Sequence, residues 1–231
     1  MDTKLINKLT FSYKTLSLLL KAGIVVSVIA LFASLYENRV LVGLDSNLKP
    51  DAIDEKMLIS NLIVGLTALF QLILSVVTLI FGARFLYFAH KNIRENLKAD
   101  KLKFTPGWVI GWYFIPVANL WKPFQAMKEL WRASKNQKDW WTSEFTSALL
   151  PWWWTLWIIG TAADRASFRL SLKAKYVNEL ITSNLVTLTS DIFQIPLTIL
   201  FFMIVQRVYA MQMESLKRIE ANEQEIKESF N

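Results

Sequence analysis

The chain of 231 residues contains no cysteine and only one histidine, His90. Without a thiol, the protein cannot form a disulfide, use a thiolate nucleophile or bind a cysteine-ligated zinc ion. One imidazole leaves carboxylates as the other protein ligands for a metal ion. The acidic residues Asp51, Asp54 and Glu55 lie close in sequence, but they lack the ordered spacing and the turn glycine of a calcium-binding loop. We therefore predict no metal site.

The common catalytic motifs are also missing. The sequence has no Walker phosphate-binding loop, no Gly-x-Ser-x-Gly turn and no His-Glu-x-x-His pair. Its apolar segments contain no paired carboxylates for acid–base chemistry, so a hydrolase would have to use Asp164, Asp191 or Glu129 singly. We predict a non-enzymatic protein without catalytic residues or a cofactor.

Charged residues are scarce, at 19% of the chain, whereas 53% of the residues are hydrophobic. Several apolar runs approach the length of about 20 residues that a helix needs to cross a bilayer. This composition predicts an all-α, polytopic helical membrane protein. The net charge of +7 is typical of loops retained beside anionic lipid. We predict no nucleic-acid binding, because no basic stripe is interleaved with exposed aromatic residues.

The apolar runs predict four spans in a single membrane domain, residues 1–231: about 16–36, 57–81, 148–163 and 192–209. The segment 84–103 carries six Lys and Arg residues, whereas the loop 37–56 is mainly acidic. The positive-inside rule therefore places 84–103 and the N-terminus in the cytoplasm. His90 lies in the basic segment, and we interpret it as an interfacial histidine.

All ten tryptophans lie between Trp108 and Trp157. The first part of this region, 104–121, is apolar but is broken by proline and glycine. Such backbone is tolerated at membrane depth only where other protein or a water-filled cavity satisfies its polar groups. The stretch 108–121 would be about 21 Å long as a helix, against a hydrocarbon core of about 30 Å. A re-entrant segment keeps most Lys and Arg residues inside, and we favour it over a short, broken span.

An amphipathic helix is predicted over residues 120–135. Its apolar residues are spaced by four, three and four: Leu120, Phe124, Met127 and Trp131. We expect this helix to lie in the membrane interface. Four nearby indoles are expected at the level of the headgroups: Trp121, Trp131, Trp140 and Trp141.

The end of the chain carries a second amphipathic pattern, in the cytoplasmic tail 211–231. The tail either extends the last span as a helix or forms a short partner helix. We expect Pro196 in the first turn of the last span, where a proline costs little, and Asp191 at its start as a cap.

Three sequence segments carry a resemblance to a known family. They are GWVIGWYFIPVANLWKPFQAMKELW (107–131), PWWWTLW (151–157) and SFRL (167–170). Together they resemble bacterial membrane proteins of domain-of-unknown-function family 4328, over most of the chain. The resemblance implies a multispan protein of the bacterial cytoplasmic membrane and a shared core at 107–131. It implies no activity, because the family has no assigned chemistry.

We predict a functional or structural core made of glycine, proline, aromatic and charged residues. Its members are Gly107, Trp108, Gly111, Trp112, Pro116, Asn119, Trp121, Lys122, Pro123, Glu129, Trp131, Trp153, Trp154, Arg165 and Arg169. Ionisable groups near apolar segments are costly unless they are paired, which makes them candidates for a site.

Several of these residues also have a purely structural interpretation. Asn119 would cap the following helix, and Lys122 would extend to the headgroups. Glu129 would pair on the surface with Arg132 or Lys128. The Gly-x-x-x-Gly pair at 107 and 111 would allow another helix to approach closely.

Two functions are compatible with these features. In the first, the protein is a membrane interaction, scaffold or regulatory protein that binds lipid, a partner membrane protein or a second copy of itself. In the second, it is a small-solute transporter or channel, and the helix break Pro116–Asn119 lines the path. The sequence contains no convincing internal repeat, which favours the first.

Overall fold

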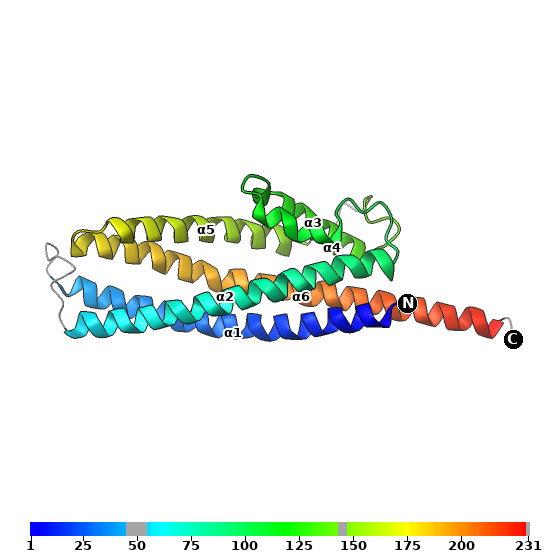
Figure 1. Ribbon diagram of the computed structural model, residues 1–231, viewed down its shortest axis with the longest axis horizontal. Coiled ribbons are helices and arrows are strands. Elements are labelled where there is room, and N and C mark those ends of the chain that lie inside the picture. The colour runs from blue at the N-terminus through cyan, green and yellow to red at the C-terminus, as the bar shows by residue number, and fades with distance from the viewer. Residues whose placement is uncertain (45–54, 143–146, 230–231) are drawn as a thin grey trace. The chain divides into compact units, whose positions relative to one another are not determined.

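Every element of the described structure is helical. The computed structural model describes residues 1–44, 55–142 and 147–229 (Figure 1). Its long helices are α1 (Thr3–Val42), α2 (Glu55–Glu95), α5 (Leu149–Lys173) and α6 (Val177–Ser229). Between α2 and α5 lie four short ones, α3 (Pro106–Gly111), η1 (Trp112–Phe114), η2 (Ala118–Leu120) and α4 (Lys122–Lys135). The predicted all-α class is confirmed, whereas Asp51 and Asp54 lie outside the described residues.

Each of the four predicted spans falls on one long helix. The helices α1, α2 and α6 are long and apolar enough to cross a membrane. The helix α5 is not one of these three, since its first half contains four tryptophans, whose hydropathy is low, and its second half carries Asp164, Arg165, Arg169 and Lys173. All four helices extend beyond the predicted spans, because polar residues continue the helix after the apolar run ends.

The apolar stretch of α2 is hydrophobic on all sides. None of its most apolar 18 residues is buried by the rest of the chain. Successive turns expose Leu62, Leu66, Phe70 and Ile73. A helix of this kind needs an apolar surrounding other than its own chain, such as a bilayer.

Two compact units make up the chain. The first unit comprises residues 1–18, 78–152 and 201–231, and the second comprises 19–77 and 153–200. In the first unit, the largest fully buried side chains include Leu9, Phe85, Ile93, Leu130 and Ile204. In the second unit, a small cluster joins Leu41 and Met57 to Val177.

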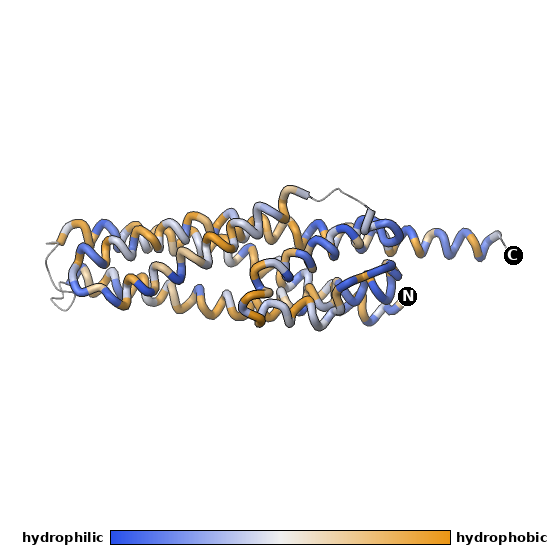
Figure 2. Tube along the Cα trace, turned by 90° about the horizontal axis from the view of Figure 1, so that it is seen from above, coloured by the Kyte–Doolittle hydropathy of each residue, from blue (hydrophilic) through white to orange (hydrophobic). Residues whose placement is uncertain are grey.

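The helix α6 begins earlier than the sequence predicts. It starts at Val177, and the carboxylate of Glu179 in its first turn accepts the backbone N–H of Lys175 at 2.5 Å. This bond caps the helix well before Asp191. The expected capping role of Asp191 and the first-turn position of Pro196 are therefore wrong, because both residues lie inside α6. The helix continues to Ser229, so the tail is an extension of α6, and most of the residues of the tail are hydrophilic (Figure 2).

Candidate functional site

The tryptophan-rich segment folds back on itself within the first unit. We call residues 104–135 the tryptophan hairpin: the chain runs through α3, turns through η1 and η2, and returns along α4, which contacts α3 (Figure 1). Its two flanks meet at the base. The backbone N–H of Asp100 donates to the carbonyl of Gln137 at 3.2 Å, and the indole N–H of Trp140 donates to the carbonyl of Asp100 at 2.6 Å.

Proline positions explain the short helices of the hairpin. Thr105 caps α3, because its side chain accepts the backbone N–H of Trp108, and Pro106 occupies the first turn. Ile115 precedes Pro116 and is extended, as a residue before proline prefers. Pro123 lies in the first turn of α4 and is buried. The segment is thus broken where the sequence predicts a break.

Glu129 holds the base of the hairpin from the inside. It is 3% exposed, and its two carboxylate oxygens accept the backbone N–H groups of Lys103 (2.8 Å) and Phe104 (3.1 Å). Burial raises the pKa of Glu129 above its ordinary value, although these two hydrogen bonds and the charges of Arg94 and Lys103 oppose the shift. The expected surface pairing of Glu129 with Arg132 or Lys128 is wrong.

A buried glutamine connects the hairpin to α2 and α6. Gln212 on α6 is fully buried, and its Nε2 donates to Ser134 Oγ of α4 (2.9 Å) and to the carbonyl of Ala89 (3.2 Å). Its Oε1 accepts Asn92 Nδ2 of α2 at 2.8 Å. None of these residues was among those predicted from the sequence. The sequence shows that these polar residues lie among apolar ones in their helices. It does not show which of them contact one another.

The aromatic residues of this region divide into buried and exposed groups. Trp131 and Trp140 are both 5% exposed and belong to the core of the first unit, so their expected positions among headgroups are wrong. Trp121 is exposed, and Trp141 is half-buried beneath Lys101, whose Nζ lies 4.1 Å from the ring centroid. The difference arises because the amphipathic face of α4 packs against protein.

His90 is also a core residue rather than an interfacial one. It is 1% exposed, and its Nδ1 lies 3.2 Å from the carbonyl of Leu86, one turn earlier on α2. Arg94 lies one turn later on α2 and is exposed, whereas the ring of His90 is buried, and the sequence position alone does not reveal this difference.

Lys122 lies over two aromatic rings of the hairpin, those of Trp112 and Phe104. The ammonium group of Lys122 lies 5.4 Å from the ring centroid of Trp112 and 5.9 Å from that of Phe104, which fits cation–π contacts. The N-cap of α4 is Trp121, with no side-chain hydrogen bond, so the predicted capping role of Asn119 is wrong. The buried atoms Asn119 Oδ1 and Trp112 Nε1 have no hydrogen-bond partner among the described residues.

The two glycines of the hairpin do not contact a second helix of the described chain. A Cβ on Gly107 would have no neighbour within 4 Å, and one on Gly111 would meet only the ring of Trp108, at 3.1 Å. The rings of Trp108 and Trp112 lie 4.9 Å apart by their centroids. The lack of a side chain at Gly111 thus leaves room for the ring of Trp108 within the hairpin. The expected close approach of another helix is not seen in the described chain.

Large apolar side chains are exposed at the tip of the hairpin. They are Trp108, Phe114, Val117, Leu120 and Trp121. Phe114 is 74% exposed and Val117 is 66% exposed, although both belong to a segment held by hydrogen bonds at its base. A group of exposed large apolar side chains close together in one segment is typical of a site that binds lipid or another apolar partner.

The remaining predicted core residues lie in the second unit. Trp153 and Trp154 are buried, with ring centroids 5.2 Å apart. Arg165 and Arg169 are exposed on α5. The hairpin therefore contains the predicted residues from Gly107 to Trp131 and none of these four. In the described ranges, no three acidic or histidine side chains are placed to share one metal ion.

The architecture is that of a helical membrane protein, with three helices long and apolar enough to span and an apolar hairpin attached to them. Residues 50–210 match the sequence model of a family described as a domain of unknown function, DUF4328, and the chain belongs to this family. The match includes the whole hairpin. No curated protein and no solved structure matches the chain.

Proposed function

We propose that the protein is a non-enzymatic interaction and scaffold protein of the bacterial cytoplasmic membrane, and that its tryptophan hairpin inserts into the cytoplasmic leaflet. The observation that carries this proposal is the contrast within the hairpin. Its base is held by Glu129, Trp140 and Gln212, whereas its tip exposes large apolar side chains such as Phe114 and Val117.

The proposed topology has four spans and both termini in the cytoplasm. The hydrogen bonds of Asp100 with Gln137 and Trp140 support a re-entrant hairpin, because they bring the chain before and after it to one place. A crossing segment would place these flanks on opposite sides of about 30 Å of hydrocarbon. The basic residues near the base, including Lys101, Lys103 and Lys128, then face the anionic surface of the cytoplasmic leaflet.

The exposed tip has enough apolar surface to anchor the hairpin. Burying a side chain such as Phe114 or Val117 contributes about 1.5–3 kcal/mol. This gain exceeds the cost of ordering an apolar side chain, which is about 0.5–1 kcal/mol for a residue such as leucine, so the surplus grows with each such residue placed in lipid. The indoles of Trp108 and Trp121 are suited to the adjoining interface, where both the apolar ring and the N–H are accommodated.

Thiol labelling tests the topology, because the native chain has no cysteine. Lys138→Cys and Asn178→Cys place single thiols at exposed positions. The neighbouring Asn136 is less suitable for substitution, because its side chain accepts the backbone N–H groups of Lys138 and Asp139. With an impermeant maleimide on intact cells, we expect residue 178 to be labelled and residue 138 to be protected. The reverse pattern would show that the hairpin segment crosses the membrane.

Lipid quenching tests the insertion itself. A fluorophore attached to Val117→Cys in proteoliposomes should be quenched by lipids that carry a nitroxide on the acyl chain. The same fluorophore on Lys138→Cys, beyond the base, is the matched control and should not be quenched. Equal quenching at the two positions, or none at residue 117, would contradict insertion. A copurifying protein that protects residue 117 from the lipid would identify a partner-binding role instead.

A small-solute path along the hairpin is the second candidate function. It is favoured by Asn119 Oδ1 and Trp112 Nε1, which are buried beside the Pro116 break without hydrogen-bond partners among the described residues. Proteoliposome swelling in urea and glycerol tests this function. A permeability that falls in Asn119→Ala but not in Gln125→Ala, an exposed position on α4, would support the path and would contradict a purely scaffolding role.

A further inference from the structure

A group of carboxylates lies between α1 and α6 in the second unit. Ser34 Oγ on α1 donates to Asp191 Oδ2 on α6 at 2.7 Å. In the same contact, Asn184 Nδ2 on α6 donates to Glu37 Oε2 at 2.7 Å and to the carbonyl of Ser34 at 3.3 Å. Both carboxylates are thus fixed by neutral donors, and two helices place them against one another.

Helix periodicity explains why these residues meet. Ser34 and Glu37 are three residues apart on α1, and Asn184 and Asp191 are seven residues apart on α6, so each pair lies on one helix face. Asp164 of α5 adds a third carboxylate nearby, as a hydrogen-bond acceptor for Ser190. The negative charge of Asp191 repels those of Glu37 and Asp164.

These carboxylates have no cationic partner in the described chain. The ion pairs Lys91–Glu95 and Glu214–Arg218 both belong to the first unit, and neither includes one of these carboxylates. The nearest basic residue along α1 is Arg39, which is exposed and, two residues after Glu37, lies on the opposite side of the helix. Like charges that are partly removed from water are costly unless a counter-charge is supplied.

Two buried amide oxygens near these carboxylates lack a hydrogen-bond partner among the described residues. Asn184 is 4% exposed, and although its Nδ2 is bonded to Glu37, its Oδ1 has no hydrogen-bond partner among the described residues. The buried Oδ1 of Asn38, next to Glu37, has none either. The contact therefore contains more acceptor oxygens than donors, and a buried acceptor without a donor is unfavourable.

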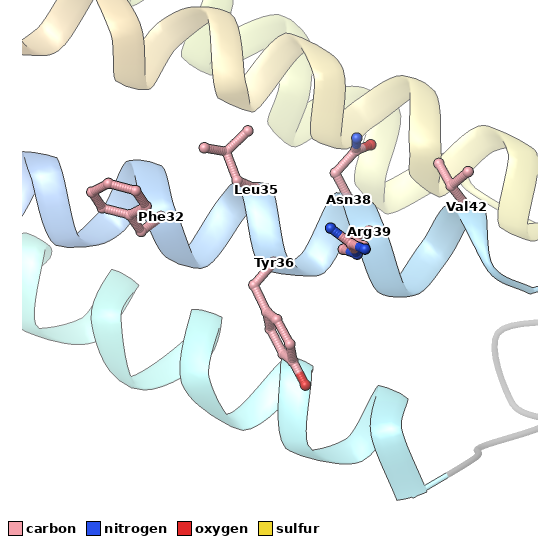
Figure 3. Close-up of a pocket in the computed structure, with 6 residues that line it drawn as sticks. All are labelled: Phe32, Leu35, Tyr36, Asn38, Arg39 and Val42. Carbon is pink, nitrogen blue, oxygen red and sulfur yellow. The ribbon is translucent and has the colours of Figure 1, made fainter.

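An open hollow lies next to this region on the surface of α1. It is lined by Phe32, Leu35, Tyr36, Asn38, Arg39 and Val42. Figure 3 shows Asn38 pointing from α1 toward the neighbouring helices α5 and α6, whereas Tyr36 points toward α2. Asn38 thus borders both the hollow and the helix contact.

We propose that Glu37, Asp191 and the Oδ1 atom of Asn184 bind one hard cation, of the class of Na⁺ or Ca²⁺. All three ligands offer oxygen, which hard cations prefer, and the cation supplies the missing positive charge. Asp164 is a neighbour rather than a ligand, since no three carboxylates of the described residues are placed to share an ion. This inference goes beyond the proposed scaffold function and does not depend on it.

Ion-dependent stability of the purified full chain tests the proposal. Thermal unfolding in a non-ionic detergent at pH 7.5 is followed by tryptophan fluorescence, with NaCl or CaCl₂ added and choline chloride keeping the ionic strength constant. We expect a saturable rise in Tm of about 5 °C or more when one ion reaches about 100 times its Kd. The ion that raises Tm at the lower concentration shows whether the site prefers a monovalent or a divalent cation.

The variants Glu37→Gln and Asp191→Asn keep an oxygen for the existing hydrogen bonds and remove one charge. They should unfold at a higher temperature than the native protein in ion-free buffer, and they should lose the response to the ion. Glu220→Gln, an exposed position in the tail, is the matched control and should retain the response.

A native protein that responds to neither ion would overturn the proposal, and so would an undiminished response in Glu37→Gln and Asp191→Asn. If these variants do not fold, equilibrium dialysis of the native protein with ²²Na⁺ and ⁴⁵Ca²⁺ decides the question. One bound ion per chain supports the site, and none overturns it.

Discussion

The contact between Gln212 and Asn92 should stabilise the folded state by more than an exposed hydrogen bond would. Both side chains are fully buried, and Asn92 Nδ2 donates to Gln212 Oε1 at 2.8 Å. Gln212→Met keeps the length of the side chain and removes its polar atoms. Asn92→Leu does the same at the other end of the bond. The two residues are separated by 120 positions, so their coupling reports tertiary structure and not local helix stability.

The expected magnitude follows from the groups left without partners. Gln212→Met leaves the Asn92 amide without its acceptor, which costs about 1–3 kcal/mol in a buried site. Asn92→Leu leaves Gln212 Oε1 unpaired and removes the acceptor of Asn96 Nδ2, at a similar cost. In the double variant neither side chain of the pair remains unsatisfied. Its loss of stability should therefore be smaller than the sum of the single losses by about 1 kcal/mol or more.

Equilibrium unfolding in mixed micelles measures these differences. Trp131 and Trp140 are buried in the same unit, so tryptophan fluorescence reports the loss of this core. The slope against denaturant must stay constant across the four proteins for the comparison to hold. Additive losses, with a coupling energy under about 0.3 kcal/mol, would refute the reasoning that this bond joins α2 to α6.

Other perturbations test the base and the tip of the hairpin. Because burial raises the folded-state pKa of Glu129, its protonated form favours folding. That contribution is complete below the ordinary glutamate pKa and is lost as the pH rises through the folded-state pKa, so Glu129→Gln should flatten the fall of Tm as the pH rises above the ordinary glutamate pKa; an unchanged slope would mean that other groups cause the fall. Trp140→Phe keeps an aromatic ring but loses the bond to Asp100 and part of the buried indole, and unfolding should show a loss of about 0.5–1.5 kcal/mol from the hydrogen bond, with a further loss from the smaller ring; no loss would mean that the base is held elsewhere. Leu130→Ala at a fully buried position should cost about 2–5 kcal/mol, whereas the exposed Leu120→Ala should change detergent stability by less than about 0.5 kcal/mol; similar losses at both positions would contradict the assignment of buried and exposed faces.

The helices could be predicted because apolar runs and proline positions act locally. The spans 57–81 and 192–209 fall on α2 and α6 for this reason, and the break at Pro116 lies in the hairpin. Helix ends were predicted less well. An apolar run marks the part of a helix that is hydrophobic, whereas α6 continues through polar residues from Val177 to Ser229, held at its start by Glu179.

The partners of the buried residues could not be predicted. A spacing of four, three and four defines an apolar face on α4, but it does not say whether Trp131 on that face meets lipid or protein. The same limit applies to Glu129, whose acceptor oxygens are used by backbone groups 25 and 26 residues away. The free N–H groups of Lys103 and Phe104 exist only because the chain is neither helix nor strand there, and a periodic pattern contains no such information.

The structure of the hairpin links its rigidity to its proposed use. A loop with exposed Phe114 and Val117 that was free to move could bury these side chains against its own chain. Here α4 is fixed through Ser134 and Gln212, and the entrance to α3 is fixed through Glu129. The tip therefore keeps its apolar side chains outward, and its ordering entropy has already been lost on folding. Under the proposed insertion, lipid contact would contribute its burial energy without a further cost for ordering the backbone of the tip.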